Sequence, residues 1–402
     1  MIVNIAAIAL VVVLSVLSLL ALYQWVHAIV SILSSRQCKL VSTPRQLRFL
    51  VLIPAHNEES GIGATLNSLA ETEYPKEFVH VVVIADRCTD ATAKVSRSYG
   101  VDCYERSSGA SGKGAALSWA IDQAKSVGVP FDALVVIDAD CLVHKDLLAA
   151  FNQALLEKQE IQQGYNYICN PWESYFTRII AVTGVLKNGL YYQAKTALGL
   201  PGVLTGTGMC FSRRVIDQYG WNAHSVAEDW EFSTALLLAG EKVYYNPLAL
   251  TLAKESKGLN QASTQRLRWA SGRYGVIGSS AWKLFFEAVH SRSVYLLDAA
   301  ITLVAPNYSS QASLTLLCVA SAWFVSADPL WGFLFPWAAS ILGSLALYFL
   351  VGVTQTASPF RALEGLLLVP FFLPWRLVIE ILGVLGYGRK GWVRDHRQHL
   401  GN

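Results

Sequence analysis

Two aspartates, Asp138 and Asp140, directly follow the apolar run ALVVI at residues 133–137. Because side chains two residues apart in an extended chain point the same way, both carboxylates can face one divalent ion. Alternatively, one can bind the ion while the other holds a sugar or ribose hydroxyl. Carboxylate oxygens suit Mg²⁺ or Mn²⁺, which usually share their coordination with substrate phosphates. Solvated turns carry the same spacing, so the position after a buried strand is what favours a ligand site.

A second acidic pair, Glu228 and Asp229, precedes a predicted helix at residues 231–239. Acidic residues at a helix start often only complement the positive end of the helix dipole. A carboxylate at this place can also act as a general base that takes the proton of an acceptor hydroxyl. The residues alone leave both roles open.

The stretch STQRLRWASGR, residues 263–273, places three arginines around Trp269. A basic collar at a membrane face has this composition. A reaction site has it too, because an arginine can neutralise a phosphate leaving group and an indole can stack on a sugar ring. We expect a membrane-surface helix whose arginine and tryptophan face a site.

The glycine-rich stretch SSGASGKGAAL, residues 107–117, leads into a predicted helix and contains Lys113. It is not a P-loop, because Gly114 stands where that motif has Ser or Thr after the lysine. Backbone amides and Lys113 could still lie near a diphosphate. A flexible loop with helix-start glycines explains the same residues.

The predicted fold must bring these residues together. The sequence pattern in the middle of the chain alternates between predicted strands and predicted helices. The pattern predicts a mainly parallel sheet wound on both faces, in which ligands bind at the carboxyl ends of the strands. The motif PAHNEE, an aspartate and the DAD triplet stand at three such ends. The predicted strands are residues 48–54, 78–85, 101–105 and 133–137.

Only 15% of the 402 residues are charged and 53% are hydrophobic, against about 25% charged residues in soluble proteins. Residues 5–32 are apolar over more than the roughly 20 residues that cross a bilayer. They lack the positive start and the short apolar core of a cleaved signal peptide. Arg36, Lys39, Arg45 and Arg48 follow, which by the positive-inside rule predicts a cytoplasmic domain next.

Two further spans are predicted at residues 310–325 and 331–353. Residues 363–385 contain charged residues and prolines, and form either a third span with functional charges or a bent interfacial helix pair. The interfacial interpretation is preferred, because the basic tail at residues 389–402 favours an inside C-terminus and an even number of spans.

The chain is therefore divided into five parts. These are an N-terminal transmembrane helix, a cytoplasmic domain with interfacial helices, an interfacial segment, a membrane region with two or three hydrophobic segments, and a basic cytoplasmic tail: residues 1–34, 45–275, 276–304, 305–388 and 389–402. Within the domain, the aromatic and basic stretch at residues 165–200 is either one wall of an acceptor site or a helix packed in the core.

The composition argues against several kinds of site and partner. The seven cysteines form no C-x-x-C pair, so a zinc site or a disulfide framework is not expected. The net charge of +3 is too small to indicate nucleic acid as a partner.

Five short motifs occur in one order along the chain, namely PAHNEE, an aspartate after the second strand, DAD, ED and QRLRW. Together they resemble those of the membrane-embedded family 2 glycosyltransferases. That family includes cellulose, poly-N-acetylglucosamine, chitin and hyaluronan synthases, and also ceramide glucosyltransferases. The resemblance covers residues 47–275 and the flanking membrane plan. It implies an α/β fold, in which a GT-A nucleotide-sugar-binding domain with a mainly parallel sheet is flanked by transmembrane and interfacial helices.

On the donor side, the resemblance implies a UDP-sugar, UDP-N-acetylglucosamine or UDP-glucose. Ala55 and Glu58 would line the uridine pocket, and Asp86 would contact the uracil. Asp138 would serve the nucleotide-sugar, and Asp140 would bind its Mn²⁺ or Mg²⁺.

On the acceptor side, the resemblance makes Asp229 the catalytic base, with Glu228 beside it. Gln265, Arg268 and Trp269 would lie on an interfacial helix, with Arg268 at the diphosphate and Trp269 under the acceptor sugar. In-line attack with one carboxylate and no covalent intermediate inverts the anomeric carbon.

The resemblance predicts a processive synthase of a β-linked polysaccharide with coupled secretion, in a bacterial-type inner or plasma membrane. The alternative is transfer of one sugar to a lipid such as a ceramide or a diacylglycerol. Few spans are predicted, so a polymer channel would need a secretion partner, a second copy in a homo-oligomer, or the bent segment at residues 363–385.

Overall fold

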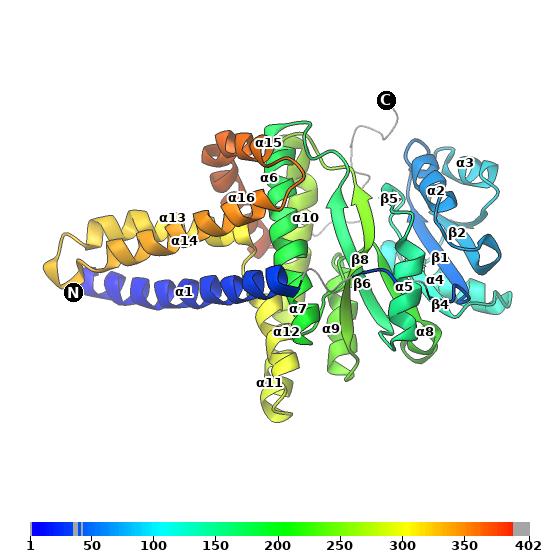
Figure 1. Ribbon diagram of the computed structural model, residues 1–402, viewed down its shortest axis with the longest axis horizontal. Helices are drawn as coiled ribbons and strands as arrows, with labels where there is room; N and C mark the ends of the chain where they lie inside the picture. Colours follow the sequence, from blue (N-terminus) through cyan, green and yellow to red (C-terminus); the bar gives the residue numbers. More distant parts are fainter. Residues whose placement is uncertain (1, 35–38, 42, 389–402) are drawn as a thin grey trace.

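The computed structural model describes residues 2–34, 39–41 and 43–388 (Figure 1). A sheet with its covering helices forms one end of the molecule. A bundle of long helices projects from the other end, and a layer of helices that cross the bundle's direction lies between the two. The basic tail predicted at residues 389–402 lies outside the described residues, as does Arg36.

The strands at the centre and at both edges of the sheet are short, and the longer strands lie between them. They are β1 (Phe49–Ala55), β2 (Val79–Asp86), β3 (Asp102–Arg106), β4 (Ala133–Val136), β5 (Cys141–Val143), β6 (Ile161–Ile168), β7 (Met209–Ser212) and β8 (Val243–Ala253). The described chain joins them into one eight-stranded sheet of order β3-β2-β1-β4-β7-β6-β8-β5. The strands from β3 to β4 pair in parallel, β7 is antiparallel to β4 and β6, β8 is parallel to β6, and β5 is antiparallel to β8.

The predicted parallel sheet is confirmed in its first half, where all four predicted strands lie within one residue of their expected bounds. The second half is mixed rather than parallel. There β7 reverses direction after Gly206 and Gly208, whose positive φ angles of 91° and 63° turn the chain.

The helices of this domain cover both faces of the sheet. They are α2 (Ile62–Ala70), η1 (Lys76–Phe78), α3 (Thr92–Ser98), α4 (Lys113–Ser126), α5 (Leu147–Leu156), α8 (Arg213–Tyr219) and α9 (Glu228–Leu238). Successive side chains of β1 enter opposite cores: Leu50 and Leu52 pack in a cluster with residues of α4 and α9, and Val51 and Ile53 pack in a cluster with residues of α2 and α5. Burial on both faces explains why the strand is apolar at every position.

The middle layer consists of helices with aromatic and basic residues. They are α6 (Tyr175–Gly184), the π-helix η2 (Val185–Tyr192), α7 (Gln193–Leu198), α10 (Leu259–Val276), the π-helix η3 (Ile277–Ala281), α11 (Trp282–His290), α12 (Val294–Val304), α15 (Pro359–Glu364), η5 (Gly365–Leu368) and α16 (Val369–Val384). The projecting bundle consists of α1 (Ile2–Ser34), α13 (Tyr308–Val325), η4 (Pro329–Trp331) and α14 (Leu334–Thr354).

Among the described residues, three helices are long and apolar enough to cross a membrane: Asn4–Ser34, Pro329–Thr354 and Pro359–Val384. The expected span at residues 331–353 corresponds to the second of these. The expected span at residues 310–325 forms the helix α13 but is not one of the three. It packs against α1 and α14 around a seam of small and branched side chains.

The segment predicted as a bent interfacial helix, residues 363–385, lies along α10. Trp375 Nε1 donates to Ser263 Oγ at 2.9 Å, and Tyr274 donates to Glu380 at 2.9 Å. A Cβ on Gly383 would lie 2.7 Å from the Cβ of Ala270, so the two backbones are in close contact. Thus the segment Pro359–Val384, although apolar and long enough to cross a membrane, is tied through α16 to a helix of the middle layer.

A buried polar network fixes α1 to the middle layer. Lys195 forms an ion pair with Asp298 and also donates to Thr302 Oγ1 at 2.6 Å. Tyr23 of α1 donates to the same Asp298 carboxylate, and its neighbour His27 stacks on Tyr191 with ring centres 5.0 Å apart. A buried charge needs such partners, so the network determines how α1 is rotated against α7 and α12.

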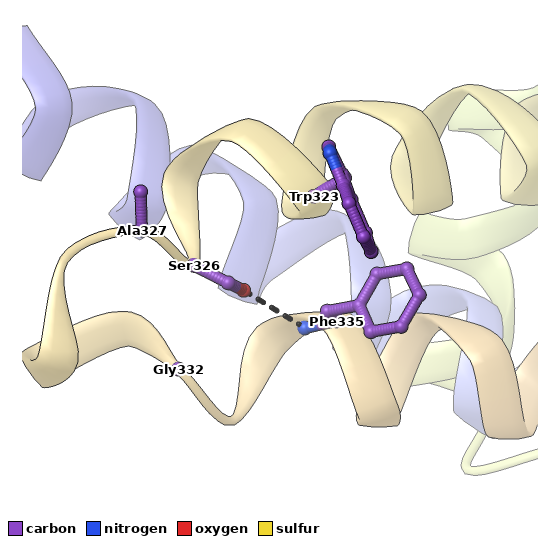
Figure 2. Close-up of a pocket in the computed structure, with 5 residues that line it drawn as sticks. All are labelled: Trp323, Ser326, Ala327, Gly332 and Phe335. Atoms are coloured by element: carbon purple, nitrogen blue, oxygen red, sulfur yellow. Dashed lines mark hydrogen bonds between the residues drawn. The ribbon is translucent and has the colours of Figure 1, made fainter.

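An open hollow of about 410 Å³ lies at the turn between α13 and α14, at the far end of the bundle (Figure 2). Trp323 and Phe335 meet there with ring centres 5.2 Å apart, and the Phe335 amide donates to Ser326 Oγ at 3.3 Å. It holds none of the residues predicted to do chemistry, which lie at the sheet.

Candidate active site

The DAD triplet follows β4, which is buried between β1 and β7. The ligand atoms of Asp138, Asp140 and Cys141 all lie within 4.8 Å of one another. The Asp138 amide donates to Thr207 Oγ1 at 3.0 Å, which fixes the triplet to the glycine-rich turn before β7. Two carboxylates at this spacing fit Mn²⁺ or Mg²⁺. The thiol of Cys141 was not predicted, and only its place after the DAD triplet could have indicated it.

Lys113, the first residue of α4, points at these acids. Its ammonium donates to Asp138 Oδ1 at 2.5 Å and to the Gly206 carbonyl at 2.6 Å, and lies 3.8 Å from Glu228. Burial alone would lower the pKa of Lys113, but Asp138 and then Glu228 raise it well above its usual value. Lys113, predicted at the diphosphate, is therefore a charged partner of the acidic cluster.

The next residue explains why a glycine follows the lysine. A Cβ on Gly114 would lie 2.0 Å from the carbonyl oxygen of Ala223. Only glycine lets α4 begin this close to the loop that leads to α9, and so brings Lys113 to the acids.

The predicted acidic pair opens α9. Burial, together with the neighbouring Asp229 carboxylate, raises the pKa of Glu228 to about 7. Burial also raises the pKa of Asp229, against the hydrogen bond from the Trp230 amide at 2.8 Å. Glu228 is buried and Asp229 half-buried, so Asp229 is the carboxylate that a ligand can reach. A base whose pKa is raised toward neutrality suits proton abstraction from a hydroxyl.

The PAHNEE loop is tied to the end of β2. His56 Nδ1 is bonded to the Asp86 carbonyl at 2.7 Å, Asn57 Oδ1 accepts from the Thr89 amide at 2.7 Å, and the Glu58 amide donates to Thr92 Oγ1 at 2.8 Å. Ala55, predicted to line the uridine pocket, is fully buried in the core of the sheet.

Asp86 lies at the end of β2, as predicted, but its carboxylate is already paired. It is 1% exposed, accepts from Arg106 at 2.6 Å and accepts from Arg87 through both oxygens at 3.0 Å. Sequence analysis missed both arginines. The register of the parallel strands β2 and β3, which pairs Asp86 with Arg106, is seen only in the structure.

The predicted QRLRW residues lie on α10. Gln265 is 5% exposed and its Oε1 has no hydrogen-bond partner among the described residues. Arg268 is half-buried, and the structure gives it no hydrogen bond or ion pair in the described chain. Trp269 is 45% exposed, and Arg266, paired with Glu255 at 2.5 Å, lies 5.0 Å from its ring centre.

The helix α10 is packed against the start of α9. A Cβ on Gly272 would lie 2.9 Å from that of Ala227, and the Arg273 guanidinium lies 5.6 Å from the ring centre of Trp230. The structure therefore brings the RW helix to the residues that flank Asp229. PAHNEE and Asp86 stand at the ends of β1 and β2 in the first half of the same sheet.

Comparison with known proteins identifies the family. Residues 44–272, more than half of the chain, match the sequence profile of the "Glycosyltransferase like family 2". The chain belongs to this family. Its domain has the GT-A fold, a mixed α/β sheet with apolar helices at its ends.

Two curated relatives cover the same region. A beta-monoglucosyldiacylglycerol synthase of a Nostoc species is 29% identical over 239 residues, which are 56% of this chain and 48% of that protein. The poly-beta-1,6-N-acetyl-D-glucosamine synthase of Staphylococcus aureus is 26% identical over 237 residues, 56% of this chain and 54% of that protein. The chain thus spans about half the length of the curated relatives that it matches.

A solved structure is similar over nearly the whole chain. The mannosyltransferase PcManGT from Pyrobaculum calidifontis, in complex with GDP-Man and Mn²⁺, aligns with a TM-score of 0.56 over 95% of this chain and 98% of that one, at 18% identity. At this identity the likeness shows the fold.

Proposed function

We propose that this glycosyltransferase moves one sugar from a UDP-sugar to a hydroxyl group of a membrane lipid, with inversion at the anomeric carbon. The observation that carries the proposal is the packing of α10 against the start of α9. This packing puts the half-buried Asp229 beside the layer of helices from which the apolar bundle projects. A lipid acceptor reaches the base from that side.

The reaction follows from the residues at the site. The acceptor oxygen attacks C1 of the sugar while Asp229 takes its proton, and the bond from C1 to the diphosphate oxygen breaks with its electron pair on the diphosphate. Arg268, a cation without a partner in the described chain, neutralises the leaving diphosphate. Asp138 and Asp140 would hold Mn²⁺ or Mg²⁺, which supplies further neutralisation when bound. Lys113 keeps Asp138 oriented.

The packing of the bundle supports a lipid rather than a polymer. The seam between α1 and α14 is filled by buried side chains, among them Leu14, Leu17, Ile341 and Leu345, each at most 4% exposed. A growing polysaccharide needs a passage, and the seam in the described helices is closed. One relative is named a beta-monoglucosyldiacylglycerol synthase, which agrees with a lipid acceptor.

A second candidate is the processive polysaccharide synthase expected from the sequence. The exposed indole of Trp269, held by Arg266, supports it as a stacking surface for an acceptor sugar. Another relative is named a poly-N-acetylglucosamine synthase. In this case a second copy or a partner protein would supply the passage.

We also propose the membrane plan and domain limits predicted above, with residues 45–275 on the cytoplasmic side. The helix α11 supports the interfacial segment at residues 276–304, because Trp282, Phe285 and Phe286 form an exposed aromatic cluster on it. Such a face suits the boundary between headgroups and acyl chains.

The test uses the purified full chain in nanodiscs with radiolabelled UDP-glucose or UDP-N-acetylglucosamine and Mn²⁺, beside Asp229→Asn. We expect a small, organic-extractable labelled product from one donor, and none from the variant. A high-mass, glycosidase-sensitive product would establish the polysaccharide synthase instead. Equal UDP release by the wild type and Asp229→Asn would refute the assignment of the base.

A further inference from the structure

Lys187 lies on the π-helix η2, which is enclosed by three parts of the molecule. Asn188 Nδ2 donates to the Asn166 carbonyl of β6 at 2.6 Å, and Ser31 of α1 donates to the Gly189 carbonyl at 2.5 Å. The side chain of Leu186 fits against Gly352 of α14, where a Cβ would lie 2.4 Å away. The turn that carries Lys187 therefore connects the sheet to the membrane bundle, and π-helical turns frequently occur at functional sites.

The side chain of Lys187 is exposed, yet it belongs to the surroundings of the base. Its ammonium lies 5.9 Å from the ring centre of Tyr192, a buried residue whose cluster also includes Trp230. The surrounding protein lowers the pKa of Lys187 below its usual value although its side chain reaches solvent, Asp229 raises it, and Arg266 and Arg273 lower it. Lys187 is therefore a solvent-accessible cation within electrostatic reach of Asp229.

The cations around Lys187 differ in whether they have a carboxylate partner. Lys113, Lys195 and Arg266 have carboxylate partners in Asp138, Asp298 and Glu255. In the part of the chain that the structure describes, no carboxylate lies within ion-pair distance of Lys187, Arg268 or Arg273.

Of these three cations, Arg268 is assigned to the donor diphosphate in the mechanism above. Arg273 donates to the carbonyl oxygens of Leu303 and Ala305 at the end of α12, and these carry no full charge. Its Nε and that of Arg266 are buried without a partner in the described chain. Positive charge therefore remains on the acceptor side after the donor is accounted for, and an anion bound there would be favoured.

We propose that Lys187 binds the phosphate of an anionic phospholipid acceptor, whose headgroup hydroxyl is then presented to Asp229. This inference rests on the proposed function and names its substrate class. The headgroup oxygen forms the new bond to C1, its proton goes to Asp229, and the nucleoside diphosphate leaves. The phosphate of the lipid takes no part in bond making. Lys187 thus acts as a residue that determines the acceptor.

The test compares two acceptors in mixed micelles, phosphatidylglycerol and the neutral dioleoylglycerol, with the UDP-sugar that the wild type accepts. We expect the wild type to prefer phosphatidylglycerol. Lys187→Met should raise the KM for phosphatidylglycerol about tenfold or more, as for one charge-assisted hydrogen bond, and leave the KM for the donor and for dioleoylglycerol unchanged. Lys187→Arg should restore most of the preference.

A matched control and a soluble probe separate the sources of the effect. Lys283→Met removes an exposed lysine from α11 and should change neither KM. Glycerol phosphate at millimolar concentration should compete with phosphatidylglycerol in the wild type and less in Lys187→Met, which assigns the effect to the headgroup phosphate. If Lys283→Met had the same effect, general attraction to an anionic surface would explain the preference and the inference would be overturned.

Three further outcomes would overturn either this inference or the proposed function. If Lys187→Met lowers kcat equally with both lipids and shifts its pH profile, Lys187 serves only the ionisation of Asp229 and the inference fails. A labelled lipid product without preference for phosphatidylglycerol overturns this inference but leaves the proposed function intact. A labelled polymer without lipid product overturns the proposed function itself.

Discussion

The two halves of the sheet carry their charges in different ways. In the first half, β1 to β4, the functional acids already have partners: Asp86 is held by Arg87 and Arg106, and Asp138 by Lys113. In the second half, where α9, α10 and η2 meet, Arg268 and Lys187 have no ion-pair partner among the described residues.

This difference indicates which half is complete without a ligand. Paired charges are stable on their own and can orient the donor site before anything binds. Charges without partners are neutralised only when an anion arrives. We therefore expect substitutions in the first half to act mainly on stability, and those in the second half mainly on turnover.

The largest effect should come from Asp229→Asn in the second half. Loss of the general base should lower kcat by about 10²–10⁴-fold, with little change in thermal unfolding, because Asn keeps the shape of the side chain. Transfer of radiolabelled sugar and thermal unfolding in detergent measure the two effects. The matched control Asp122→Asn removes an exposed carboxylate of α4 and should change neither. If Asp229→Asn lowered the unfolding temperature as well as kcat, the expected difference between the two halves of the sheet would be contradicted.

In the first half, Arg106→Met should act on stability. It removes the buried partner of Asp86, so the free energy of unfolding should fall by about 3 kcal/mol. Arg97→Met breaks an exposed ion pair between Arg97 of α3 and Glu105 of β3. It should lower the free energy of unfolding by less than about 1 kcal/mol. Chemical denaturation of both variants measures the difference. Equal losses would show that burial of the Asp86 pair is not what matters.

The substitution Gly114→Ala probes the junction of the two halves. The new Cβ would clash with the Ala223 carbonyl at 2.0 Å, so α4 must shift and take Lys113 away from the acids. We expect a loss of about 1–3 kcal/mol in stability, together with reduced activity. Gly278→Ala adds the same methyl group in open space and should be neutral. Full activity of Gly114→Ala would mean that the position of Lys113 is unimportant.

The smallest effect should come from Glu228→Gln and should depend on pH. The folded pKa of Glu228 is about 7, above the unfolded value of about 4.3. The folded state therefore binds the proton more tightly, and stability falls as pH rises from about 4 to 7. Glu228→Gln removes this loss and should therefore stabilise the protein at pH 8 but not at pH 5.

Melting curves at the two pH values measure this prediction. The kcat of the wild type should also rise with pH through the raised pKa of Asp229, because the base must be ionised. Stabilisation by Glu228→Gln that is the same at both pH values would contradict the assigned pKa.

The sequence predicted the parallel strands because their residues are buried on both faces, as Leu50 and Val51 show in opposite cores. It also predicted that PAHNEE, Asp86 and the DAD triplet stand at strand ends, since local periodicity locates those ends. The mixed second half of the sheet was harder to predict from the sequence, because the reversal of the chain before β7 involves the positive φ angles of Gly206 and Gly208.

The partners of the predicted residues could not be read from the sequence. Asp86 and Arg106 are 20 residues apart, and Lys113 and Glu228 are far more distant, so their pairing depends on register and on close helix packing. Lys187 belongs to no motif that could have singled it out in the sequence. It is one of several basic and aromatic residues in its stretch, and only the fold brings it near Asp229.

The length of α1 has a consequence for the acceptor. Its 33 residues extend about 50 Å, whereas the hydrocarbon core of a bilayer is about 30 Å thick. The polar contacts of α1 with the middle layer, through Tyr23 and His27, belong to its C-terminal half. In the membrane plan proposed above, the helix would act as a rigid strut that holds the proposed base Asp229 at a fixed height above the acyl chains. Lipids would then be sorted by how far their headgroup extends from the membrane, and lengthening or shortening α1 by one turn would change which headgroups reach Asp229.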